Sequence, residues 1–277
     1  MDRAGTSSNP ITVENYPGER PVLRSSGDHP LRVNGSGAWF RFRGFVIENH
    51  PGTSGGNVDL YGSFLEISNN EIRGSVDQGI YTDEESDHNY IINNWIHHNG
   101  EGRTHQSHGI YLQGDDHLVA NNVIHDHPEG FGIQVYDKGA RAIVVNNTIT
   151  SSAHSGIVVG GSGGVSGVVV RNNILAFNAH WGISHDSSCP SSSVADTNVL
   201  FGNAWGATQS GCSGLSYAGG NTELDPMFVN YGALNLHLLA LSPAIGRTRG
   251  EWSPRFDRDG ETRPQGSASD AGAYEDG

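Results

Sequence analysis

The chain has 277 residues, of which 35% are apolar, and carries a formal net charge of −14. That charge argues against a nucleic-acid-binding protein, because phosphate binding requires a basic surface. No apolar run approaches the roughly 18 residues of a transmembrane helix, and the polar start of the chain is not typical of a signal peptide.

The chain divides into three stretches of one predicted domain that spans residues 1–277. Residues 1–56 are expected to form N-terminal coils, residues 57–206 regular repeats, and residues 207–277 a terminal coil and a C-terminal segment. The 39 glycines, together with abundant asparagine and serine, indicate many short strands joined by turns.

Two patterns recur about every 25 residues. A Gly-Ile pair begins at Gly79, Gly109, Gly132, Gly156 and Gly182, and an Asn-Asn pair begins at Asn69, Asn93, Asn121, Asn146 and Asn172. Apolar residues alternate within each repeat, as they do in strands. So small a unit buries its apolar face only by coiling, with each strand stacked about 4.8 Å from its equivalent. We therefore predict an all-β fold, a single parallel β-helix of about eight coils.

The predicted stacking assigns side chains to the inside or the outside of the coil. The isoleucine of each Gly-Ile pair is expected to point inward, and the asparagines are expected at bends with φ > 0. Alternation then gives two outward columns. The first is Tyr81, Tyr111, Gln134, Val158 and Ser184, and the second is Asp83, Gln113, Tyr136, Gly160 and Asp186. The face is aromatic and polar over its first three coils and then blank at Val158 and Gly160, so a binding face is expected between residues 77 and 141.

Histidines gather in the same region, with eight of the fourteen between His88 and His127. The longest coil contains an insertion with Arg103, His105 and His108, which we expect to form one wall of a cleft. On another strand His97 should stack on His125, and His98 on Asp126. These four residues form either a transition-metal cluster or a hydrogen-bonded ladder.

Acidic residues cluster in the turn "TDEESDH", residues 82–88, and in the matching turn one coil further. Asp83, Glu84 and Asp115 are the candidate ligands of a Ca²⁺ ion, which prefers oxygen donors. The alternative is a solvated acidic turn.

The two cysteines, Cys189 and Cys212, are separated by about one coil. Stacked positions would place them within disulfide range, and a disulfide would suit an exported protein. Two free buried thiols are the alternative.

The repeats resemble those of right-handed parallel β-helix proteins of the pectate-lyase type. "GTSSNPITVENYPGERPVL" resembles an early coil of secreted bacterial members, and "DRDGETRPQGSASDAGAYE" resembles part of their terminal segment. Such proteins usually have a further coil and a cap at the N-terminus, so the chain is expected to be a mature or trimmed form. Its open first coil should be covered by a loop, by a removed segment or by a partner chain, including a second copy.

This resemblance implies a secreted, extracellular protein that acts on a polysaccharide, most simply a lyase that cleaves a uronic-acid polymer by β-elimination. That reaction needs a cation beside the substrate carboxylate, a base and an acid. The candidate catalytic residues are Lys138, Tyr111, Tyr136, His108 and Arg141. The candidate substrate-binding residues are Tyr81, Gln113, Gln134, Arg103, His105 and His154. Lys138 is the only lysine in the chain, and its alternative role is an ion pair with Asp115.

Other functions remain open at this point. "NNVIHDHPEGFGIQV" is similar to a repeat segment of mannuronan C5-epimerases, although their "DPH" signature is not found in the sequence. A glycoside hydrolase would need two facing carboxylates, for which Asp83 and Asp115 are the proposed pair. A non-catalytic glycan-binding or surface β-helix is the rival from another class, because a fold does not determine function.

Overall fold

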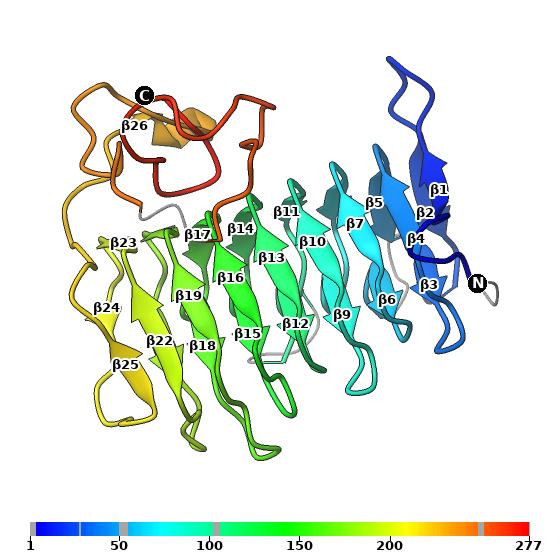
Figure 1. Cartoon of the computed structure of the whole chain (residues 1–277), viewed down its shortest axis with the longest axis horizontal. Helices are drawn as coiled ribbons and strands as arrows, with labels where there is room; N and C mark the ends of the chain where they lie inside the picture. The colour runs from blue at the N-terminus through cyan, green and yellow to red at the C-terminus, as the bar shows by residue number, and fades with distance from the viewer. Residues whose placement is uncertain (1–3, 28, 50–54, 102–105, 249–251, 277) are drawn as a thin grey trace.

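The computed structural model describes residues 4–27, 29–49, 55–101, 106–248 and 252–276. The described residues up to Tyr217 coil into a solenoid of parallel sheets with about eight turns (Figure 1). One sheet has the order β1 (Ile11–Glu14), β4 (Phe40–Arg43), β7 (Glu66–Ser68), β10 (Tyr90–Ile92), β13 (Leu118–Ala120), β16 (Ile143–Val145), β19 (Val169–Arg171), β22 (Ser193–Asp196) and β25 (Leu215–Tyr217).

Two further sheets complete each turn. The second sheet consists of β2 (Val22–Ser25), β5 (Val46–Asn49), β8 (Glu71–Arg73), β11 (Trp95–His97), β14 (Val123–His127), β17 (Thr148–Ser152), β20 (Ile174–Ala176) and β23 (Val199–Phe201). The third consists of β3 (Leu31–Val33), β6 (Val58–Leu60), β9 (Ile80–Thr82), β12 (Ile110–Leu112), β15 (Ile133–Val135), β18 (Ile157–Val159), β21 (Trp181–His185) and β24 (Gly206–Thr208). The predicted all-β solenoid is confirmed.

The predicted inward stack lies in the third sheet. The paired positions run from Ile80 through Ile110, Ile133 and Ile157 to Ile183, and all five side chains are fully buried. The same register aligns Tyr81, Tyr111 and Gln134 on the outer face, as the first outward column predicts.

The Asn-Asn pairs occupy a bend between the first and second sheets. The first asparagine of each pair has a positive φ, between 53° and 60°, which asparagine tolerates better than most residues. The second is buried and hydrogen-bonded to its equivalent in the next coil. Asn94 Nδ2, for example, donates to Asn122 Oδ1 at 3.0 Å. The asparagines are therefore structural, as expected.

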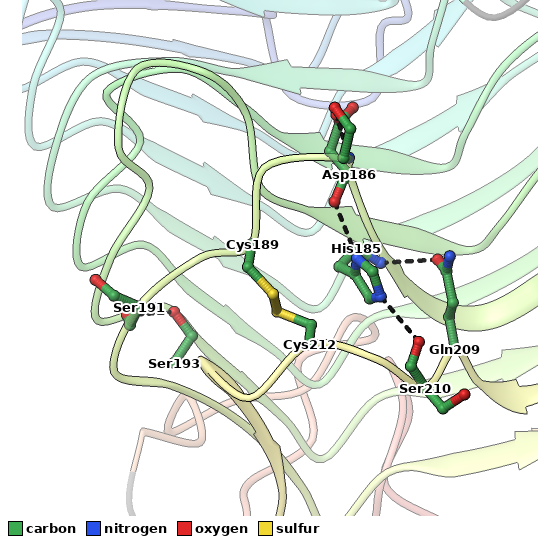
Figure 2. The surroundings of a disulfide bond; sticks show 9 residues. His185, Asp186, Cys189, Ser191, Ser193, Gln209, Ser210 and Cys212 are labelled. Atoms are coloured by element: carbon green, nitrogen blue, oxygen red, sulfur yellow. Dashed lines mark hydrogen bonds between the residues drawn. A yellow bond between two sulfur atoms is a disulfide. The ribbon is translucent and has the colours of Figure 1, made fainter.

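Cys189 and Cys212 form the predicted disulfide, with their Cα atoms 5.6 Å apart. The bond links the loops that follow β21 and β24 (Figure 2). His185, at the end of β21, is held beside it by contacts of its ring with the carbonyl oxygens of Asp186 and Ser210, at 2.9 and 3.1 Å. The loop that starts at Asp186 is therefore anchored at its start, by His185, and at Cys189.

The C-terminal segment folds back over the outer face of the second sheet. It contains the antiparallel pair β26 (Phe228–Asn230) and β27 (Asn235–Leu238), joined by the short helix η1 (Tyr231–Ala233). Leu238 belongs to a buried apolar cluster with Ile174 and Val199, and Leu236 belongs to another with Val123. Figure 1 shows this segment on one side of the solenoid, away from β12, β15 and β18.

The N-terminal coil is the less buried end of the core. Ile11, Val13 and Leu23 are only partly buried, whereas Phe42 and Ile47 in the next coil are almost fully buried. A partner chain over this end remains a prediction. In the described part of the chain, no helix has the length and apolar character needed to span a membrane.

Candidate functional site

A cavity with a volume of about 460 Å³ opens on the outer face of the third sheet, a size within the range of ligand pockets. It lies over β9, β12 and β15, where the two outward columns predict a binding face. Its lining consists of Asp77, Gln78, Tyr81, Gln106, His108, Tyr111, Gln113, Gln134, Tyr136 and Asp186. Six predicted residues are thus brought together: Tyr81, His108, Tyr111, Gln113, Gln134 and Tyr136.

Stacked aromatic rings form one wall of this cavity. Tyr81 and Tyr111, one coil apart, have ring centroids 5.7 Å apart and planes inclined by 16°. His108 lies almost parallel to Tyr111 at 5.7 Å, and Tyr136 is tilted against Tyr111 at 5.9 Å. Such a row of rings offers flat, partly apolar surfaces with polar edges.

The tyrosine hydroxyls remain protonated at neutral pH. Burial raises the pKa of Tyr81, and the nearby Asp83 raises it further. Burial, followed by Asp137, likewise raises the pKa of Tyr111. The pKa of Tyr136 is raised by the same two causes but to a smaller extent, because Tyr136 is less buried. At neutral pH these phenols are therefore donors, and Tyr136 is the one that ionises first as the pH rises.

His108 is buried, and its Nδ1 accepts a hydrogen bond from the backbone N–H of Phe131 at 3.2 Å. In the neutral ring Nε2 then carries the proton. His108 is therefore arranged as a donor through Nε2 and as a parallel neighbour of Tyr111. It is not arranged as a ready proton acceptor.

Four lining residues were not among the predicted site residues: Asp77, Gln78, Gln106 and Asp186. Asp186 belongs to the second outward column, so its position in the repeat could have identified it as a residue of the site. Asp77 and Gln78 lie just before a Gly-Ile pair, where His108 also lies. Ser107 Oγ donates to Asp77 Oδ1 at 3.2 Å. The outward columns were counted along the strand that follows each Gly-Ile pair. They therefore did not include Asp77, Gln78 and Gln106, which precede that strand.

Lys138 and Arg141, the predicted cations that the structure describes, lie outside the cavity lining. Lys138 Nζ is 2.7 Å from Glu84 Oε2, and both side chains are about half exposed. The suggested pair with Asp115 is therefore wrong. Arg141 instead contacts Asp115 at 2.9 Å and Asp116 at 2.7 Å. Among the described residues that line the cavity, none is lysine or arginine.

The acidic turns do not fit a Ca²⁺ site in this arrangement. Glu84 and Asp115 are engaged by Lys138 and Arg141, and Asp83 accepts a hydrogen bond from the Tyr81 hydroxyl at 3.2 Å. In the part of the chain that the structure describes, their oxygens are not among the groups whose ligand atoms converge. We therefore derive no step through calcium.

Three other predicted binding residues lie elsewhere. His154 packs against Phe131 and His180, beyond the lining of the cavity. Arg103 and His105 lie outside the described residues.

The histidine cluster around His97 and His125 has the predicted stacking on β11 and β14. The rings of His97 and His125 are parallel, with centroids 5.0 Å apart. Trp95 Nε1 donates to His125 Nε2 at 2.6 Å, so His125 Nδ1 carries the proton and donates to Asp126 at 2.7 Å. Ligand atoms of His98, His125 and Asp126 lie within 4.8 Å of one another. With both nitrogens of His125 engaged, the arrangement fits the hydrogen-bonded ladder better than a metal centre.

Comparison with known proteins agrees with this architecture. Residues 103–226 match the family model described as "Right handed beta helix region". The fold is a right-handed parallel β-helix. The crystal structure of a pectate lyase, Pel9A, is similar with a TM-score of 0.63 and 15% identity, covering 100% of this chain and 82% of that one.

Two further solved structures are similar at low identity. An alginate lyase from Paenibacillus sp. str. FPU-7 has a TM-score of 0.51 and 17% identity, over 79% of this chain and 85% of that one. The A-module of the Azotobacter vinelandii mannuronan C-5 epimerase AlgE4 has a TM-score of 0.54 and 16% identity, over 72% and 58%. No curated protein sequence matches the chain. At these identities the likeness concerns the fold.

Proposed function

We propose that the protein binds a polysaccharide in the cavity over β9, β12 and β15 and cleaves it as a polysaccharide lyase. The observation that carries this proposal is the row of rings of Tyr81, Tyr111 and His108 beside amide side chains. Stacked rings provide platforms for the apolar faces of sugars, and amides provide hydrogen bonds to hydroxyl groups. The folds of a pectate lyase and an alginate lyase support the same class of substrate.

In this reaction a base removes the proton on C5 of a uronic acid. The electron pair forms the C4–C5 double bond, and the glycosidic oxygen on C4 leaves with a proton from an acid. Tyr111 is the proposed acid, because its raised pKa keeps the hydroxyl protonated. Tyr136 is the proposed base, since it is the phenol of the wall that ionises most easily.

Lys138 is the proposed cation for the substrate carboxylate. Its ion pair with Glu84 is exposed, and ion pairs in contact with solvent contribute little to stability. Exchanging Glu84 for a substrate carboxylate therefore costs little. Arg141 is less available, because two carboxylates hold its guanidinium. Arg103 and His105, on the inserted segment, are proposed as further substrate contacts.

The test is incubation with alginate, pectate and glycosaminoglycans while the absorbance of the unsaturated product is followed in the ultraviolet. The wild type should produce it on one polymer. Tyr111→Phe should lower kcat by at least about 100-fold, as expected for a lost proton donor. Lys138→Gln should lower activity strongly and Arg141→Gln only weakly. Absence of the chromophore on every uronate polymer would overturn the lyase proposal.

The structure does not favour a glycoside hydrolase, the other cleaving enzyme considered. Asp77 and Asp186 both line the cavity, but they belong to coils four steps, or about 19 Å, apart, whereas the carboxyl groups of a hydrolase lie roughly 5–10 Å apart. The pair expected from the sequence, Asp83 and Asp115, is not free either, because Asp115 is engaged by Arg141. Hydrolysis would produce reducing ends without the ultraviolet chromophore.

The remaining alternatives are separated by the same assays. An epimerase would change the uronate composition without cleavage, and a non-catalytic glycan-binding β-helix would bind without any product. Calcium dependence is tested by activity with EDTA and after Ca²⁺ is restored. We propose an extracellular location, which the disulfide between Cys189 and Cys212 supports.

A further inference from the structure

A line of aromatic rings leaves the cavity towards the C-terminal coils. It begins at His108, which lines the cavity and contacts Phe131, with ring centroids 5.2 Å apart. Phe131 contacts His154 at 5.4 Å, and His154 contacts His180 at 4.5 Å. Each ring in this line lies one coil beyond the previous one.

The line ends at Trp205. Its indole is stacked on His180, with centroids 3.7 Å apart and planes inclined by 13°. Trp181 meets the same indole edge-on at 6.3 Å. Trp205 is therefore held in a defined orientation by two other rings.

The register of the third sheet explains this arrangement. Ile133 pairs with Ile157, Ile157 with Ile183, and Trp181 with Gly206. The turn before each strand consequently stacks on the turn of the preceding coil. Four steps separate Trp205 from His108, or about 19 Å at the strand spacing of about 4.8 Å.

Exposure to solvent distinguishes Trp205 from the histidines earlier in the line. His108 and His154 are only 1% and 7% exposed, whereas Trp205 is 58% exposed. The buried rings support the line, and Trp205 presents a free indole surface to solvent. A single exposed apolar residue needs no explanation, but this one is continuous with the rim of a cavity through stacked rings.

We propose that Trp205 is a distal subsite for the same polysaccharide chain that occupies the cavity. The inference rests on the proposed function, because the ligand is a further stretch of the same acidic glycan. The glycan runs along the solenoid axis from Tyr111 towards the C-terminal coils, and a sugar ring packs on the indole of Trp205. Affinity should then depend on chain length.

The experiment measures binding of oligosaccharides of increasing length, from dimer to decamer, by calorimetry. The oligosaccharides are prepared from the polymer that the wild type binds. Trp205→Ala should weaken binding about fivefold to tenfold for oligomers that span about 19 Å, and should leave dimers and trimers unchanged. Trp205→Phe, which keeps a ring, should restore most of the affinity. Trp252→Ala is the matched control, because Trp252 is similarly exposed, at 53%, and lies in the C-terminal segment.

Each outcome separates the subsite from the cavity. Equal affinity of Trp205→Ala and wild type at every length would overturn the subsite while leaving the cavity intact. An equal loss at every length, including the dimer, would show a general structural effect and would also overturn it. Tyr111→Ala should weaken binding of short and long oligomers alike. Failure of the wild type to bind any uronate oligomer would overturn the proposed function, and the subsite with it.

Discussion

Replacing Asn70 with alanine should lower the free energy of unfolding by about 2 to 5 kcal/mol. Asn70 Oδ1 accepts the backbone N–H of Phe45 at 3.0 Å. Its Nδ2 donates to the Phe42 carbonyl at 3.0 Å and to Asn94 Oδ1 at 3.1 Å. The side chain is buried, so alanine leaves the Phe45 amide and the Phe42 carbonyl without this partner away from water. Each such orphaned group costs about 1–3 kcal/mol.

Asn69→Gly is the matched control in the same Asn-Asn pair. Asn69 is exposed and has a φ of 56°, a conformation that glycine adopts without strain. Its replacement should change stability by no more than about 0.5 kcal/mol. Urea unfolding followed by circular dichroism measures both variants. If Asn70→Ala unfolds at the same urea concentration as Asn69→Gly, the buried asparagine ladder does not stabilise the coils and the reasoning fails.

Three further predictions concern the core, the disulfide and the chemistry. Ile133→Ala should cost about 2 to 5 kcal/mol of unfolding free energy, and an unchanged urea midpoint would contradict the buried isoleucine stack. Replacing Cys189 and Cys212 with serine should cost about 3 kcal/mol, because the bond closes a loop across 23 positions; identical melting with and without reductant would argue against it. If Tyr136 is the base, kcat should rise with pH beyond pH 9, because only the phenolate accepts a proton and the pKa of Tyr136 lies above the ordinary 10. An activity optimum near neutrality would exclude this role.

Much of the candidate site could be predicted because it follows from the repeat. Once the coil length is known, Tyr111 must lie over Tyr81, and the structure places the two rings in contact. The ion-pair partner of Lys138, in the turn after β15, could not be predicted in the same way. Lys138 aligns with Asp115 by counting, yet its amine contacts Glu84, two coils away. A long side chain at a residue with a φ of 58° is not confined to its own column.

The sequence by itself determined the coil length, the inward isoleucine stack and the two outward columns, because these depend on local periodicity. Only the tertiary structure decided which outer face remains open, since the C-terminal segment covers the second sheet through a buried cluster that contains Leu238 and Val199. It also decided which charges line the cavity. Asp77 and Asp186 both line it although they belong to coils far apart in the chain, while Lys138 and Arg141 pair with acidic partners outside it.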